Sequence, residues 1–231
     1  MKRKVEGKSS RGIDGLRAII DGANEKKVVV ECVGLPGSGK TTICRSISQS
    51  ATSGADVDAR IRYKEYYRAN GSRCDVYAGW VIFIVTNPGV ALMLIYLLVK
   101  YRGFRYLSPY LKAARWNRWI RSEVVISNRN TLLLDEGPVQ WTLKYGPFED
   151  EYLDLIIDTY RANTDVSYAF CFFDTDVSTC VSRVMRRDKA MCSWKDKKED
   201  VLRRLFLDQI RVVQQVRQLI DREFEVVVIE S

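Results

Sequence analysis

Four short apolar runs recur along the chain, at Lys27–Val33, Thr131–Leu134, Ser167–Phe173 and Glu225–Ile229. Most positions in each run are apolar instead of every second one, which is typical of strands that are buried on both faces. Helical or mixed segments separate the runs, so the pattern predicts an α/β fold with a parallel sheet covered on both sides. Whether a further strand lies between Ser50 and Asn130 stays open, because the hydrophobic pattern there is too irregular to place one.

Helical periodicity is clearest in the C-terminal third of the chain. Apolar residues recur at three- and four-residue spacing in Asp176–Arg187 and Glu199–Asp221, which predicts two amphipathic helices. A shorter helix-compatible run, Thr42–Gln49, follows the first strand. We expect residues 1–26 to form a flexible basic arm with some helical character around Leu16 to Ile20, and residues 27–231 to form one domain.

The longest apolar stretch is Trp80–Val99, which is interrupted only by Thr86-Asn87-Pro88-Gly89. It is as long as a bilayer span. The Asn-Pro-Gly break, however, favours a turn that divides the stretch into a short apolar piece and a helix over Val90–Val99. We favour two buried segments that pack on the sheet or form a lid, and a membrane-seated hairpin is the alternative.

The segment after this stretch mixes cations with aromatic residues and holds no acidic residue before Glu123. Such a mixture occurs in interfacial helices, in nucleic-acid surfaces and in plain solvated basic faces. Its cations are Lys100, Arg102, Arg105, Lys112, Arg115, Arg118 and Arg121. The last three are spaced by three residues, so on a helix they share one face and can together bind an anionic substrate.

Composition narrows the function classes. The chain has 231 residues, of which 46% are hydrophobic and 29% charged, and a formal net charge of +8 that suits polyanionic ligands such as nucleotides. It contains no histidine, which excludes His-based triads and His-ligated zinc. The six cysteines show no C-x-x-C spacing, and Met1–Lys8 lacks the apolar core of a secretion signal. We therefore expect reduced thiols in a cytoplasmic protein.

The most specific motif directly follows the first apolar run. Residues 34 to 41 read Gly-Leu-Pro-Gly-Ser-Gly-Lys-Thr, the pattern G-x-x-x-x-G-K-T. Its glycines allow positive φ values that point successive backbone N–H groups at one anion at the start of a helix. Lys40 is then placed for the β- and γ-phosphates of a nucleotide, and the Thr41 hydroxyl for Mg²⁺. ATP and Mg²⁺ are the cofactors expected here, bound by Gly34, Pro36, Gly37, Ser38, Gly39, Lys40, Thr41 and Thr42.

Two carboxylates end the second apolar run, at Asp135 and Glu136. An acidic residue at the carboxyl end of a strand next to the first one reaches the Mg²⁺ shell beside the phosphates. We assign Asp135 to that shell or to accepting the proton of an acceptor hydroxyl. Glu136 is the alternative for either role and a candidate substrate contact, and capping of the next helix is the structural alternative for both.

Three arginines follow the third apolar run, at positions 183, 186 and 187. Their spacing allows all three to lean over one site, where guanidinium groups neutralise charge on a transferring phosphoryl group. Arg183 and Arg187 are our candidates for catalysis and ATP binding. The Lys- and Asp-rich segment Asp188–Glu199 is expected to close as a lid, and a plain surface helix is the alternative.

Taken in order, Gly34–Thr41, Asp135-Glu136-Gly137 and Arg183 to Arg187 followed by a basic loop resemble the thymidylate kinase-like branch of P-loop kinases. The resemblance covers most of residues 27–230. It implies a three-layer α/β/α sandwich with a five-stranded parallel sheet, an insertion at about 75–125 and a helical lid at about 183–199. It also implies catalytic roles for Lys40, Asp135, Arg183 and Arg187. The family carries an arginine next to the acid, where this chain has Glu136.

We therefore expect an ATP-dependent phosphotransferase that moves the γ-phosphate of ATP·Mg²⁺ to a nucleotide, nucleoside or sugar-like acceptor. That acceptor is expected between Asp135 and the basic face that carries Arg115 and Arg118. A small molecule is the expected partner and nucleic acid is not, whereas peripheral membrane contact through residues 80–121 and a homodimer stay open. The alternative function is a nucleotide-switched NTPase that docks on membrane or nucleic acid through residues 80–121.

Overall fold

The computed structural model describes part of the chain. The described residues are 9–22, 27–50, 88–101, 131–145, 150–161, 166–187 and 197–230, with the single positions 81, 84, 85, 107, 110, 111, 114 and 120.

One parallel sheet forms the centre of the fold. Its four described strands are β1 (Val28–Gly34), β2 (Thr131–Leu134), β3 (Ser167–Asp174) and β4 (Glu225–Glu230), in the order β2-β1-β3-β4. All four strands predicted from the apolar runs are confirmed to within one residue at each end. The fifth strand expected from the family resemblance is not among the described residues, which leave out much of the segment between Ser50 and Asn130.

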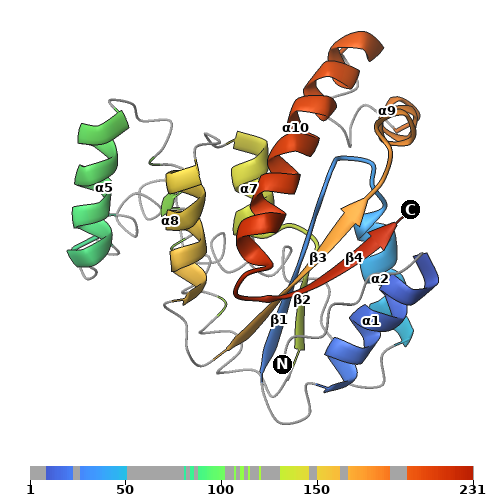
Figure 1. The fold of residues 1–231 in the computed structure, drawn as a ribbon, viewed down its shortest axis with the longest axis horizontal. Coiled ribbons are helices and arrows are strands. Elements are labelled where there is room, and N and C mark those ends of the chain that lie inside the picture. Colours follow the sequence, from blue (N-terminus) through green and yellow to red (C-terminus); the bar gives the residue numbers. More distant parts are fainter. Residues whose placement is uncertain are drawn as a thin grey trace.

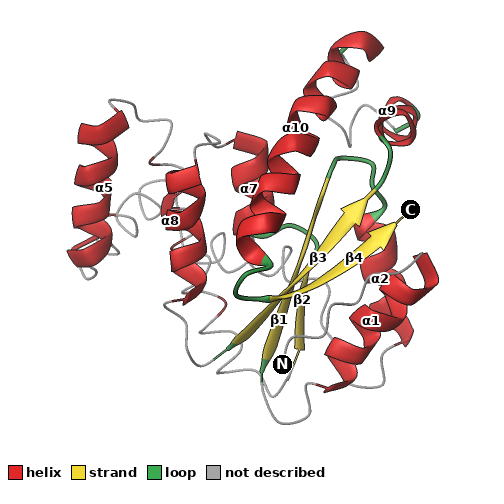
Figure 2. Ribbon diagram, viewed as in Figure 1, coloured by secondary structure: helices red, strands yellow, loops and turns green. Residues whose placement is uncertain are grey.

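The register of the sheet brings the strand ends together. Val30 in β1 lies opposite Leu133 in β2 and Ala169 in β3, and every described pairing is parallel. The carboxyl ends of β1, β2 and β3 therefore meet at one edge of the sheet. The loop after β1 and the segment after β3 leave the sheet at this edge (Figure 2).

Helices cover both faces of the sheet (Figure 1). On one face lie α1 (Ser9–Asp21) and α2 (Lys40–Ser50), and on the other lie α7 (Pro138–Tyr145), α8 (Asp150–Arg161) and α10 (Glu199–Ile220). The strand side chains alternate between two apolar clusters: Val29 and Val33 pack toward α8 and α10, whereas Val30 and Cys32 pack toward α1 and α2. This explains why nearly every strand position is apolar.

The N-terminal helix is part of the core. In α1, Leu16 and Ile20 are fully buried in the same cluster as Val227 and Ile229 of β4. A Cβ atom at Gly12 would lie 2.5 Å from the carbonyl oxygen of Val228, so the helix backbone sits directly on that strand. The expected helical character around Leu16 to Ile20 is confirmed, but a flexible arm over 1–26 is wrong for residues 9–21. Their amphipathic apolar face overrides the polar composition of the first residues.

The two predicted C-terminal helices are confirmed as α9 (Val177–Met185) and α10, with ends within two residues of the expected ones. Asp176 caps α9, because its side chain accepts a hydrogen bond of 2.9 Å from the backbone N–H of Thr179. Hydrogen bonds from Ser178 and Thr179 hold the pKa of the Asp176 carboxyl well below its ordinary range. The cap fixes where α9 leaves β3.

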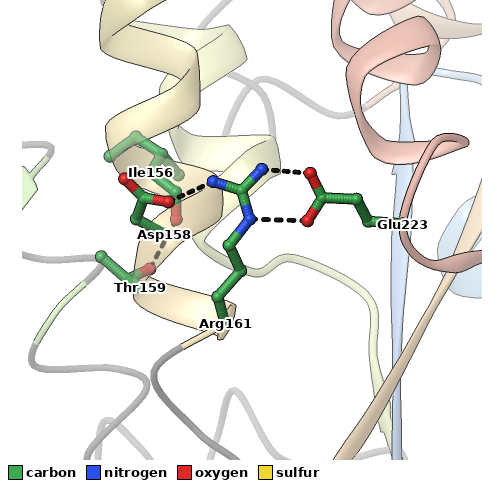
Figure 3. A network of polar contacts seen from close by, with 5 residues as sticks. All are labelled: Ile156, Asp158, Thr159, Arg161 and Glu223. Atoms are coloured by element: carbon green, nitrogen blue, oxygen red, sulfur yellow. Dashed lines mark hydrogen bonds and ion pairs between the residues drawn. The ribbon is translucent and has the colours of Figure 1, made fainter.

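A surface network joins α8 to the turn before β4 (Figure 3). The Arg161 guanidinium donates to both carboxylate oxygens of Glu223, with Nε to Oε2 at 2.6 Å, and also pairs with Asp158. Both ends of the Arg161–Glu223 pair are partly exposed, so the pair contributes on the order of 1 kcal/mol or less.

The described cysteines are free thiols, as expected. Cys32, Cys44 and Cys171 are fully buried in the apolar cluster between the sheet and the helices α1 and α2, and Cys180 is buried in α9. The sulfur atoms of Cys32 and Cys44 lie 3.3 Å apart, which is a thiol contact and not a disulfide. These residues act as small apolar core side chains.

The apolar stretch forms the helix α5 (Pro88–Tyr101), which includes the predicted helix Val90–Val99. Leu94 and Leu97 pack into the same apolar cluster as α8, but Leu92, Ile95, Tyr96 and Val99 are exposed. The expectation of a buried segment is therefore correct for one side of α5 and wrong for the other. Among the described helices, none is long and apolar enough to cross a bilayer.

Candidate functional site

The loop between β1 and α2, residues Gly34–Thr41, is the centre of the candidate site, and we call it the glycine loop. Gly37 and Gly39 have φ values of +88° and +91°, in the left-handed region that glycine adopts without strain. A Cβ atom at Gly37 would lie 2.6 Å from the carbonyl oxygen of Cys180 in α9. Gly37 is therefore required both by its backbone conformation and by the close approach of α9, and Gly39 by its backbone conformation.

The glycine loop leads straight into α2, whose first residue is Lys40. Pro36 lies in the turn of the loop, and Thr42 is exposed in the first turn of the helix. The start of a helix carries a partial positive charge and backbone N–H groups without helical partners. A loop of this shape at a helix start favours an anion.

Lys40 is folded back onto the loop. Its ammonium group donates hydrogen bonds to the carbonyl oxygens of Gly34 at 2.7 Å and Leu35 at 2.9 Å, and to the Ser38 hydroxyl at 3.4 Å. Burial lowers the pKa of Lys40, and the nearby carboxylates Asp135 and Glu136 act in the opposite direction. The cation is thus held at the inner side of the loop, in the field of both carboxylates.

Thr41 and Asp135 are in direct contact, although they lie far apart in the sequence. The Thr41 hydroxyl donates a hydrogen bond of 2.7 Å to Oδ2 of Asp135. The contact follows from the sheet, because Asp135 comes directly after β2 and β2 is the parallel neighbour of β1. The pair offers two hard oxygen ligands at the edge of the loop, the type that Mg²⁺ prefers.

Glu31 in β1 is a buried carboxylate that connects β1 with α7 and α8. The sequence analysis did not single it out. Its Oε1 accepts a hydrogen bond of 2.9 Å from the backbone N–H of Gln140, and its Oε2 accepts one from the Tyr160 hydroxyl in α8. A Cβ atom at Gly137 would overlap the Glu31 carboxylate at 2.4 Å. Glu31 therefore fixes the turn that carries Asp135 and Glu136.

Full burial raises the pKa of Glu31 from 4.5 to about 7, against the smaller opposing effect of hydrogen bonds from Tyr160 and from the backbone of Gln140, Val139 and Gly137. The Tyr160 hydroxyl is fixed from both sides, since it also accepts a hydrogen bond of 3.2 Å from the Val139 N–H. Burial also raises the pKa of Tyr160 well above 10. The carboxyl group is thus the member of this network that titrates near neutral pH.

Gln140 links the carboxylate turn to the glycine loop. Its backbone N–H is held by Glu31, and its side-chain Oε1 accepts a hydrogen bond of 2.9 Å from the backbone N–H of Gly34. On the other side of the loop, the Thr175 hydroxyl donates to the carbonyl oxygen of Ser38 at 3.3 Å. The loop is therefore held at both ends by side chains from outside it.

Arg183 reaches the glycine loop from α9. Its Nη1 donates a hydrogen bond of 3.2 Å to the carbonyl oxygen of Gly37 and lies 3.7 Å from the position of a Cβ atom at Gly39. Arg187 is exposed just beyond the end of α9, and no contact of the described residues joins its side chain to the loop. The structure thus brings one of the two candidate arginines to the site.

Other predicted site residues fall outside the described part of the chain. Arg115 and Arg118, expected at the acceptor, are among them, and so is most of the expected lid, residues 188–196. Glu136 is described, half buried beside Asp135, and close enough to influence the pKa of Lys40. The expected division of roles between the two carboxylates stays a prediction.

A pocket opens beside the glycine loop, between the carboxyl end of β3 and α10. Leu35, Phe172 and Ile210 supply apolar walls, and Asp174 and Arg217 supply charged groups. The pocket thus combines apolar walls with charged groups directly beside the loop.

Sequence reasoning missed three residues of the site: Glu31, Gln140 and Thr175. Glu31 had a signal, since it is the one acidic residue in the apolar run of β1, and a buried acid in a central strand needs polar partners. Gln140 and Thr175 had no comparable signal.

Within the described ranges, no three His, Cys, Asp or Glu side chains form a group that could hold a metal ion, so a metal bound at Thr41 and Asp135 would need ligand and water oxygens. Comparison of the sequence with models of known families and with curated proteins gives no match.

Proposed function

We propose that the protein is an ATP·Mg²⁺-dependent phosphotransferase acting on a small-molecule acceptor. The observation that carries the proposal is the contact of Thr41 with Asp135 at 2.7 Å, beside a loop with two positive-φ glycines. A phosphate-binding loop needs such glycines, and Mg²⁺ needs oxygen ligands directly next to the phosphates.

The donor set fits the proposed cofactor. Mg²⁺ keeps several waters and takes one or two protein oxygens beside substrate phosphates, which agrees with one hydroxyl and one carboxylate at this edge. When bound, Mg²⁺ supplies positive charge to the β- and γ-phosphate oxygens and orients them. The protein does not need a larger cage of carboxylates for this purpose.

The residues of the loop have separate roles in the proposal. Lys40 exchanges its hydrogen bonds with the carbonyl oxygens of Gly34 and Leu35 for phosphate oxygens, since its flexible stem allows the ammonium group to turn. Arg183, already in contact with Gly37, neutralises charge on the transferring group. Glu136 or Asp135 accepts the proton of the acceptor hydroxyl.

The test replaces Lys40 by Ala and measures phosphorylated product with a panel of nucleotide, nucleoside and sugar acceptors. Loss of Lys40 removes the cation that binds the β- and γ-phosphates, so transfer should fall by a factor on the order of a thousand. Arg45→Ala is the matched control, because Arg45 is an exposed cation of the same helix α2. It should keep wild-type transfer.

Folding of the Lys40 variant is checked separately by thermal melting without ligand. In the wild type, ATP with Mg²⁺ should raise the melting temperature, because a ligand that binds only the folded state stabilises it. A wild-type protein that shows no shift with ATP and Mg²⁺, or a folded Lys40→Ala variant that keeps full transfer, would contradict the proposal. Release of ADP and inorganic phosphate with no new phosphoester would instead support a nucleotide-switched NTPase.

A further inference from the structure

The pairing of β1 with β2 ends before the glycine loop begins. The last paired residues are Glu31 in β1 and Leu134 in β2, whereas on its other side β1 stays paired with β3 as far as Gly34 and Phe173. In the described part of the sheet, the last three residues of β1 are therefore paired with a strand on the β3 side only. Another contact has to join the start of the glycine loop to the turn after β2.

The side chain of Gln140 makes this contact. Its Oε1 accepts a hydrogen bond of 2.9 Å from the backbone N–H of Gly34, much as the carbonyl oxygen of a neighbouring strand would. Gln140 is only 8% exposed, so water competes little for this bond. A buried backbone N–H needs an acceptor, and at Gly34 a side chain supplies it.

Gln140 is itself held in place by β1. Its backbone N–H donates a hydrogen bond of 2.9 Å to Oε1 of Glu31, three residues before Gly34 in the same strand. The Tyr160 hydroxyl holds the other carboxylate oxygen of Glu31, and a Cβ atom at Gly137 would overlap this carboxylate at 2.4 Å. The two hydrogen bonds of Gln140 and the strand between their ends thus form a closed ring that joins the turn to the loop.

We propose that Gln140 is a positioning residue for phosphotransfer, which fixes the start of the glycine loop relative to the turn that carries Asp135 and Glu136. This inference rests on the proposed function. There, the loop binds the phosphates and the turn supplies the carboxylates, so transfer needs both at a constant separation. A misplacement of about 1 Å is enough to lower a rate by roughly a hundredfold.

The first test compares steady-state kinetics of the wild type and Gln140→Met. Methionine matches glutamine in length but offers no oxygen to the Gly34 N–H. We expect kcat to fall by roughly tenfold or more, and KM for ATP to stay within about threefold, because the groups of the loop that bind phosphate are unchanged. Gln140→Glu keeps an acceptor oxygen at the same reach and should recover most of the lost kcat.

The second test does not depend on activity. Amide hydrogen exchange at Gly34 is followed by NMR in the protein without nucleotide. Exchange should be roughly tenfold faster or more in Gln140→Met than in the wild type, because the N–H has lost its acceptor. Gln140→Glu should restore the protection. Gln218→Met is the matched control, since Gln218 is exposed on α10, and it should follow the wild type in both tests.

Circular dichroism and thermal melting check that each variant is folded at the assay temperature. If Gln140→Met does not fold, Gln140→Asn replaces it, because its shorter side chain withdraws the acceptor. A folded variant with wild-type kcat, unchanged exchange at Gly34, or a Gln140→Glu variant as slow as Gln140→Met would each overturn the positioning role and leave the proposed function intact. A wild type that transfers no phosphate would overturn both.

Discussion

The buried carboxyl group of Glu31 should make the stability of the protein depend on pH in a way that one substitution removes. The group keeps its proton up to about pH 7 in the folded state, whereas the unfolded chain releases it near its ordinary pKa of 4.5. The folded state therefore binds more protons over this window, and stability falls as pH rises from 4.5 through 7. Below pH 4.5 the stabilising contribution of this carboxyl group is fully present, and above about pH 7 it is lost.

The magnitude follows from the shift. Each pH unit inside the window changes the free energy of unfolding by about 1.4 kcal/mol, so the wild type should lose about 2 to 3 kcal/mol between about pH 5 and pH 8 through this group alone. Glu31→Gln keeps the shape of the protonated side chain and an oxygen that can accept from the Gln140 N–H, but it cannot titrate. The Tyr160 hydroxyl loses its acceptor in the variant, which lowers stability by about 1 kcal/mol at every pH.

The assay is urea unfolding of the wild type and of Glu31→Gln, each at about pH 5 and about pH 8. The free energy of unfolding of the wild type, relative to that of the variant, should fall by about 2 to 3 kcal/mol on going from pH 5 to pH 8. Glu225→Gln, an exposed carboxyl group at the start of β4, is the control for removing a carboxylate and should follow the wild type. A difference between wild type and Glu31→Gln that is the same at both pH values would refute the reasoning.

Three further substitutions test other parts of the structure. Gly37→Ala places a Cβ atom 2.6 Å from the Cys180 carbonyl oxygen at a positive φ, so we expect the free energy of unfolding to fall by about 2 to 4 kcal/mol and the ATP-dependent thermal shift to be lost. The control Gly89→Ala in α5 meets no atom within 4 Å and should be neutral or stabilising in thermal melts. Gly12→Ala should destabilise the protein by about 1 to 3 kcal/mol in urea unfolding, because α1 must move off β4, and an unchanged midpoint would contradict the packing of α1. Thr41→Val should raise the Mg²⁺ concentration needed for half-maximal phosphotransfer by roughly tenfold or more while leaving the melting temperature of the free protein within a few degrees, and an unchanged Mg²⁺ requirement would remove Thr41 from the metal site.

The strands and the contact between Thr41 and Asp135 could be predicted from sequence because both follow from local patterns. Strands buried on two faces are apolar throughout, and parallel neighbours bring their carboxyl ends to one edge, so a hydroxyl after β1 and a carboxylate after β2 must lie close. The predicted helix ends were also nearly correct, since an Asp at a helix start is a local signal.

Other features depend on partners that are distant in the sequence. The contact between Glu31 and Tyr160 could not be predicted from either residue. It requires α8 to pack across β1 at the position along the strand where Glu31 lies. The expectation of a flexible arm over residues 1–26 followed from the basic residues at the start of the chain. Leu16 and Ile20, however, have the spacing of a buried helix face. For α5 the helix was predictable, but which of its sides is covered depends on α8.

The pairing of the first described helix with the last strand has a consequence for synthesis on the ribosome. The surface that receives Leu16 and Ile20 includes Val227 and Ile229, which are translated only after all the intervening elements. Until then, α1 has an incomplete binding surface, and β3 lacks its neighbour on one side. A nascent chain of this protein should therefore remain sensitive to proteases and dependent on chaperones until β4 leaves the exit tunnel.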